Sequence, residues 1–283
     1  MINYLLLIIA ALMFSLQFFF QEKYQKICGT DIKTTLSFSL FSEAFIFICI
    51  FLINGFSFEF TPFSMAMCTL AALNGIMYTF CALKALRHIN VSAYSMYAML
   101  GGMLLPMVAG FLFYNEAITA NKIVACLLIL VSLFLTLDKT KNCGGGGKYY
   151  ILVFLLNGLS GVLSKIHQSS SFKQVSSLGF LQLKSFIGIF LVLAVFLFIR
   201  CKIKIPPLKA LVSVGIYSLL CGGGNLLLLV ALLSVAASVQ YPLVTGGVIA
   251  FSFIIVLFQK KRPTIREIMA AALAMVSVVI IVI

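Results

Sequence analysis

The chain has 283 residues, of which 63% are apolar and 10% are charged, and its formal net charge is +13. No soluble domain needs so much apolar surface, and apolar runs of ~20 residues are typical of helices that cross a membrane. A transmembrane barrel would show alternating segments of ~10 residues, and the chain has none. Composition therefore excludes a soluble fold and predicts an all-α membrane protein.

Ten apolar segments have lengths close to what a helix needs to cross the hydrocarbon core. The first has neither the basic start nor the small-residue cleavage site of a signal peptide, so we expect it to remain as a helix. The predicted spans are 3–20, 34–54, 63–83, 91–113, 119–137, 149–168, 177–199, 208–230, 235–258 and 267–283.

Most of the 20 lysine and arginine residues lie in the odd-numbered loops between these spans. The even-numbered loops hold only Lys122, Lys165 and Lys173. Basic loops stay on the cytoplasmic side, so we expect a multi-pass protein of the plasma (inner) membrane with both termini outside the cytoplasm. The positive charge is explained by this orientation and does not indicate a nucleic-acid partner.

Polar residues at helical spacing mark the first four spans and indicate one inward face on each. The fifth span carries only Ser132. The stripes contain Gln17 and Gln21, then Thr35, Ser39 and Glu43, then Asn74, Tyr78 and Cys81, and finally Tyr94, Tyr97 and Gly101.

A glycine-rich stretch at 138–148 divides the chain nearly in half and is typical of a flexible linker. A phosphate-binding loop is the alternative, because a glycine precedes Lys148. No Ser or Thr follows that lysine and no strand precedes the stretch, so the linker is favoured.

The second half repeats the pattern of four striped spans and a final span with one polar residue, Ser277. The seventh span places Lys184 inside an apolar segment. The stripes contain Asn157, Ser160, Ser164 and Gln168, then Gln182, Lys184 and Ser185, then Ser213, Tyr217, Cys221 and Asn225, and finally Gln240, Tyr241 and Thr245.

The two halves match as an internal repeat. A shift of 145 positions places Gly101-Gly102 on Gly246-Gly247 and Ser132 on Ser277, and a shift of 141 places Glu43 on Lys184. Five spans per copy is an odd number, so the copies must cross the membrane in opposite senses. Inverted repeats in membranes are typical of transporters with a central site between the halves. We therefore predict a first five-helix repeat at 1–137, a linker at 138–148 and an inverted second repeat at 149–283, around a central cavity.

Three short motifs stand out: Thr79–Leu86 at the end of the third span, Leu105-Pro106 with Tyr114-Asn115-Glu116, and Arg262-Pro263-Thr264. In these motifs the chain resembles EamA-type members of the drug/metabolite transporter superfamily. The resemblance implies ten helices, inverted five-helix repeats and transport by alternating access. The departures are Lys261 in place of the second acidic residue, Pro242 at a displaced position, Ala125 and Ala270 in place of glycines, and Glu43 where relatives often carry arginine.

Glu43 and Lys184 are the leading candidates for the site, because a charge inside an apolar span costs on the order of 3 kcal/mol on insertion scales. Such a charge needs a partner or a wet cavity. For Glu43 the alternative is a neutral carboxyl bonded to a nearby serine, and for Lys184 it is snorkelling to the interface. Glu43 is also the candidate site for a proton or another coupling cation.

Tyrosines and amides on the same inward faces complete the predicted substrate site. Tyrosine rings bind aromatic groups or cations, and amides donate and accept hydrogen bonds; packing and helix-to-helix bonding are the alternatives. The further candidates are Asn74, Tyr78, Tyr94, Tyr97, Asn157, Gln182, Gln240 and Tyr241. The glycine pairs are expected to be points of close helix packing, with hinges as the alternative.

These features predict a secondary transporter of small polar or amphipathic metabolites such as amino acids or amines. The alternative of the same fold is an efflux pump for multiple drugs or cations. An intramembrane enzyme is disfavoured, because no catalytic motif or pair at shared depth is present. Eight scattered cysteines and two distant histidines indicate neither a metal site nor a disulfide framework, and no cofactor is expected. The expected partners are a small-molecule substrate, the lipid bilayer and a coupling proton, with a monomer and a homodimer both open.

Overall fold

The computed structural model describes residues 2–113, 119–136, 147–200, 202–232, 237–259 and 263–282. Ten α-helices and no strands occur in these ranges, so the predicted all-α fold with ten helices is confirmed. The helices are α1 (Ile2–Cys28), α2 (Ile32–Ile53), α3 (Pro62–Leu86), α4 (Val91–Phe113), α5 (Ala120–Thr136), α6 (Gly147–Ser169), α7 (Ser177–Phe198), α8 (Leu208–Leu232), α9 (Ala237–Phe258) and α10 (Ile265–Val282).

The helix ends follow local sequence signals. Thr61 caps α3 by accepting a hydrogen bond from the backbone of Ser64, and proline occupies the next position, where its missing N–H costs nothing. At the start of α10, Thr264 and Glu267 exchange backbone-to-side-chain hydrogen bonds at 2.7 and 3.3 Å. This reciprocal pair is a capping box. Each signal fixes where a helix begins.

The first helix is longer than predicted. We expected it to end near Phe20, but α1 continues to Cys28. The next residue, Gly29, has a φ of +89°, a conformation that favours glycine. The polar residues after the apolar run therefore lie on a helix and not in a loop. This extension places Gln21 inside the bundle, fully buried.

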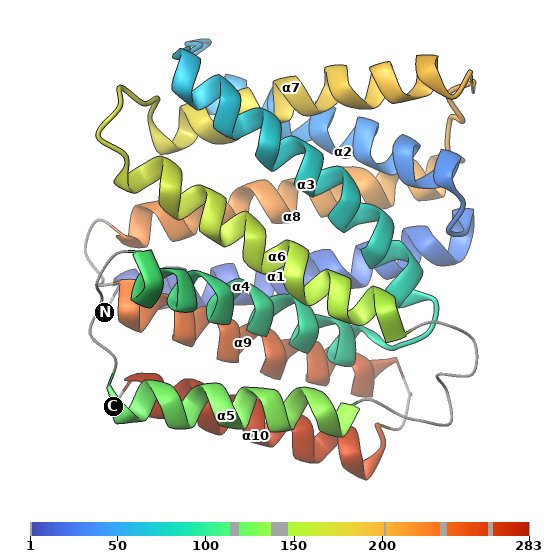
Figure 1. The fold of residues 1–283 in the computed structure, drawn as a ribbon. Coiled ribbons are helices and arrows are strands. Elements are labelled where there is room, and N and C mark those ends of the chain that lie inside the picture. The colour runs from blue at the N-terminus through green and yellow to red at the C-terminus, as the bar shows by residue number, and fades with distance from the viewer. Residues whose placement is uncertain are drawn as a thin grey trace.

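Successive helices run in opposite directions through the bundle, so α1 begins and α10 ends at the same side (Figure 1). Helices of the two halves pack on one another: α1 lies against α8 and α9, α6 lies against α3 and α4, and α2 lies against α7 and α8. The pair α5 and α10 lies side by side at one edge (Figure 1). This peripheral position suits two helices that carry a single polar residue each within their apolar cores, Ser132 and Ser277.

Seven of the ten helices in the described residues, α1 to α4 and α6 to α8, are long and apolar enough to cross a membrane. Large apolar side chains are also exposed along the outer faces, including Leu127 at 58% and Phe134 at 69% on α5. Exposed apolar surface of this extent is unfavourable in water and suits contact with acyl chains. The fold therefore fits a multi-pass membrane protein.

The predicted linker at 138–148 extends too far at its end. Gly147 and Lys148 form the first turn of α6. The rest of the linker, 138–146, lies outside the described residues.

The glycines of α4 permit a close helix crossing. A Cβ added at Gly101 would lie 2.1 Å from the backbone oxygen of Phe154 on α6. In the second half, a Cβ added at Gly247 would lie 2.8 Å from the Cβ of Ala11 on α1. Both positions are confirmed as points of close packing.

One hydrogen bond joins the two peripheral helices. The Ser132 hydroxyl on α5 donates to the Ala270 carbonyl oxygen on α10 at 2.8 Å, whereas the repeat-related Ser277 donates within its own helix to Ala274 at 2.6 Å. We expect Ser132→Ala to lower the free energy of unfolding by about 0.6 kcal/mol, the mean for polar bonds between membrane helices. Ser277→Ala is the matched control, and a loss as large as that of Ser132→Ala would contradict the assignment. Reversible unfolding in mixed detergent measures both.

Candidate functional site

Glu43 lies near the middle of α2 and packs against α7. A Cβ added at Gly188 would lie 3.2 Å from the Glu43 Cγ and 3.4 Å from its Cδ, so the two helices pack closely at this point. The Glu43 Oε2 atom is buried and has no hydrogen-bond partner in the described part of the protein. A buried carboxylate oxygen without a partner is costly, so this side chain requires a donor or a cation.

Lys184 lies one turn before Gly188 on α7 and extends toward α3, where its Cε lies 3.8 Å from a Cβ placed at Gly75. No ion pair joins Lys184 to Glu43 within the described residues. Both charged groups are nevertheless within electrostatic range of one thiol, that of Cys221 on α8. The two charged residues predicted to share a cavity are thus brought to one region, formed by α2, α3, α7 and α8, without neutralising each other.

Two of the predicted tyrosines adjoin this charged region. The hydroxyls of Tyr78 and Tyr94 are 2.7 Å apart, and Tyr94 donates to the Gln21 Oε1 atom at 3.2 Å. Tyr78 is also within electrostatic range of Cys221 and of Tyr217 on α8. A chain of hydrogen bonds therefore runs from Gln21 on α1 through Tyr94 on α4 to Tyr78 on α3, which interacts electrostatically with the same thiol as the charged groups.

Three members of this region were absent from the predicted site: Gln21, Tyr217 and Cys221. Their signal was present in the sequence, because Tyr217 and Cys221 belong to a stripe of polar residues spaced by four on α8. Gln21 was placed at the end of its span and not inside it. A longer first helix would have identified it.

Two of the predicted amides bond other helices. The Asn74 Nδ2 on α3 donates to the Leu156 carbonyl at 2.9 Å and to the Ser160 hydroxyl at 2.7 Å, both on α6. The Asn157 Nδ2 on α6 donates to the Ala98 carbonyl on α4 at 2.6 Å. These bonds hold α6 between α3 and α4, while the Oδ1 atom of Asn74 stays buried without a partner.

The remaining predicted residues lie away from the charged region or cannot be placed. Gln182 is buried and bonds to the turn between α2 and α3, and Tyr97 packs its ring 5.6 Å from that of Tyr150. The side chains of Gln240 and Tyr241 on α9 lie outside the described residues. A ligand role for these four stays a prediction.

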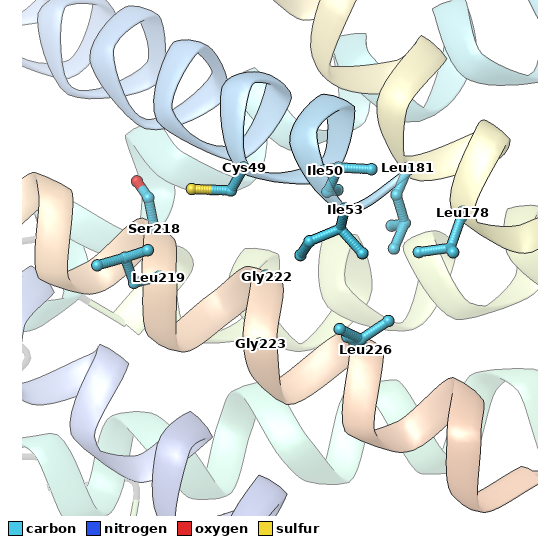
Figure 2. Close-up of a pocket in the computed structure, with 10 residues that line it drawn as sticks. All are labelled: Cys49, Ile50, Ile53, Leu178, Leu181, Ser218, Leu219, Gly222, Gly223 and Leu226. Carbon is cyan, nitrogen blue, oxygen red and sulfur yellow. The ribbon is translucent and has the colours of Figure 1, made fainter. Parts of the chain in front are cut away.

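A pocket of about 130 Å³ opens between the ends of α2 and α7 and the middle of α8 (Figure 2). Its walls are almost wholly apolar, and the exposed rim residues Ile53 and Leu219 place its mouth where acyl chains would lie. The Ser218 hydroxyl is its main polar group; it donates to the Val214 carbonyl of its own helix at 2.8 Å and lies 3.3 Å from the carbonyl of Ser42, the residue before Glu43. The lining residues are Cys49, Ile50, Ile53, Leu178, Leu181, Ser218, Leu219, Gly222, Gly223 and Leu226.

None of the ten predicted site residues lines this pocket. The charged region and the apolar pocket are neighbouring parts of the same three helices, α2, α7 and α8. Glu43 and Ile50 are two helical turns apart on α2, about 10 Å along its axis.

The fold and this site define a helical protein of the multi-pass membrane class with charged groups in its interior. No family model and no curated protein matches the chain. A solved structure described only as "Crystal structure of protein" is similar over 98% of this chain and 94% of its own length, with a TM-score of 0.56 and 16% sequence identity. At that identity the similarity concerns the fold alone.

Proposed function

We propose that the protein is a secondary transporter of small amphipathic organic molecules that carry an amino group, such as amino acids or amines. Transport proceeds by alternating access between two inverted five-helix repeats in the plasma membrane, with both termini outside the cytoplasm. Glu43 takes the coupling cation, for which a proton is the leading candidate.

The pairing of helices supports the repeat. The repeat relates each helix of the first half to the helix five places later, α1 to α6 and so on. Under this exchange the contact of α1 with α8 becomes that of α6 with α3, and the contact of α4 with α6 becomes that of α9 with α1. The pairs α2–α7, α4–α9 and α5–α10 map onto themselves. Since neighbouring helices alternate in direction, helices five apart run oppositely (Figure 1). This is the arrangement expected of an inverted repeat.

One observation carries the function: opposite charges from repeat-related helices, both partly buried, lie within electrostatic range of the same thiol without forming an ion pair in the described residues. The Glu43 carboxylate suits an ammonium group and the Lys184 ammonium suits a carboxylate, so a zwitterion satisfies both. Two uncompensated charges inside apolar helices are unfavourable for folding, which favours a role in binding.

A thermal-shift screen of the purified protein tests the proposal. We expect zwitterionic amino acids with apolar side chains to raise the melting temperature at millimolar concentration, because a ligand that binds only the folded state stabilises it. Lys184→Met should abolish the response to zwitterions. If no amino acid, amine or nucleoside shifts the melting temperature, the transporter proposal loses its support.

The efflux of apolar cations is a second candidate, favoured by the almost wholly apolar walls of the pocket. It predicts stabilisation by unrelated aromatic or alkyl cations that lack a carboxylate, with no loss of response in Lys184→Met. The same screen separates the two, since only the first candidate needs Lys184.

A further inference from the structure

A buried histidine joins the two halves at the side of the bundle where α1 begins and α10 ends. The His167 Nε2 atom, at the end of α6, lies 2.9 Å from the Ser64 hydroxyl in the first turn of α3. His167 is 2% exposed and Ser64 is fully buried. The imidazole lies between the rings of Phe63, at 5.8 Å, and Phe180, at 4.4 Å.

The hydrogen bonds of Ser64 fix the direction of its bond to the imidazole. Its oxygen accepts from the Val175 backbone N–H at 3.1 Å and from the Thr61 hydroxyl at 2.8 Å. A hydroxyl has two acceptor positions and one proton. Both acceptor positions are occupied, so Ser64 donates its proton to His167 Nε2. That nitrogen must be unprotonated, and His167 is neutral in this arrangement.

Further hydrogen bonds join the two halves at the same side of the bundle. The backbone N–H and hydroxyl of Ser176 donate to the two carboxylate oxygens of Glu59 at 2.6 and 2.7 Å. Gln182 accepts from Asn54 and donates to the Ser57 carbonyl, both at 3.0 Å. The connection between α6 and α7 is thus held to the connection between α2 and α3.

Within the described residues, no carboxylate bonds to the His167 ring. Glu59 is linked to this cluster only indirectly: it accepts hydrogen bonds from Ser176, the residue after Val175. The titratable groups on the packed elements and on its own helix are Glu59, Cys68, Lys165, Lys173 and Lys184.

We propose that Ser64 and His167 form a proton-operated latch, which holds this side of the bundle closed while His167 is neutral and releases it when His167 is protonated. A protonated imidazole presents N–H groups at both nitrogens, so Ser64 can bond to it only as an acceptor and must give up the bond from Val175 or the bond from Thr61. Loss of the Val175 bond releases the latch. Histidine ordinarily changes charge between pH 5 and 8, so acidification supplies the proton that this bond, in its present direction, cannot accommodate. The idea that opening admits solute to the site rests on the proposed function, whereas the latch itself does not.

Two measurements on the full-length protein test the latch without any substrate. The chain has only two histidines, so each imidazole can be followed by nitrogen NMR. We expect His167 to carry its proton on Nδ1 at pH 8. Hydrogen exchange at Val175 and Ser176, corrected for the intrinsic effect of pH, should become at least tenfold faster from pH 8 to pH 5.

Three variants separate the contributors. His167→Gln, which retains an acceptor for Ser64 but cannot be protonated, should make the corrected exchange independent of pH. His88→Gln, at the exposed histidine on the opposite side, and Glu59→Gln should keep the pH response. A proton on Nε2 of His167 at pH 8, or a pH response that survives in His167→Gln, would overturn the latch. The NMR measurement on the unaltered protein decides the matter even if a variant fails to fold. If ligands raise the melting temperature but the corrected exchange at Val175 does not depend on pH, the latch is wrong and the proposed function stands.

Discussion

Replacing Glu43 with glutamine is expected to abolish transport driven by an ion gradient. Substrate binding or exchange should be weakened but stay measurable, because Lys184 is unchanged and glutamine still accepts a hydrogen bond from an ammonium group. Glutamine has nearly the same shape, so its contact with Gly188 is preserved. The change removes only the group that can bind and release a cation. Coupling requires such a group at a depth where its protonation state alters substrate affinity. We expect a loss of at least tenfold in gradient-driven uptake into proteoliposomes.

The folded state should tolerate Glu43→Gln. A charge in the interior of a span costs about 3 kcal/mol on insertion scales, and one oxygen of this carboxylate is buried without a partner. The melting temperature should therefore be unchanged or higher. Glu267→Gln is a suitable control, because Glu267 caps α10 and a glutamine can also serve in a capping box. Unaltered driven uptake by Glu43→Gln would remove its coupling role, and a lower melting temperature with loss of exchange would indicate a structural one.

The positions of the helices were predictable from the sequence because each needs an apolar run, and apolar runs are local. The error in α1 has a physical cause. The segment from Gln21 to Cys28 is too polar to extend the hydrophobic span, yet nothing in it stops a helix before Gly29. Hydropathy locates the membrane-crossing part of a helix and not its end.

The charged region was partly predictable because an internal repeat relates positions that are distant in the chain. Matching Glu43 to Lys184 identified two residues that the fold brings near the same thiol. Helical spacing alone could not show whether an amide such as Asn74 faces a ligand or a neighbouring helix. That choice depends on the partner helix, and Asn74 meets a carbonyl of α6. The role of either residue in transport stays a prediction.

The pocket and the histidine latch were beyond reach of the sequence. The pocket lies where α7 and α8 both pack against α2 and hardly touch each other, an arrangement that no single stripe encodes. His167 looked isolated, since its partner Ser64 is 103 positions away. Contacts between helices of different halves require the packed bundle.

The substitution Gly101→Ala is expected to cause the largest loss of stability of any single methyl addition proposed for this protein. The new Cβ would lie 2.1 Å from the Phe154 oxygen, 2.7 Å from its carbonyl carbon and 2.8 Å from its Cα. All three are backbone atoms of α6, so no side-chain rotation relieves the overlap. The crossing is tight from both sides, because a Cβ on Gly158 would lie 2.7 Å from the Gly101 oxygen.

Relief requires α4 and α6 to move apart, which also lengthens the 2.6 Å bond from Asn157 to the Ala98 carbonyl. Overpacking ordinarily costs about 1–3 kcal/mol, and we expect at least the upper end of that range here, because backbone blocks the methyl. The measurement is the melting temperature and the yield of monodisperse protein in detergent. Gly222→Ala is the matched control, because a Cβ there meets nothing within 4 Å and alanine is the better helix former by about 1 kcal/mol. Equal stability of the two variants would show that α4 and α6 do not approach this closely.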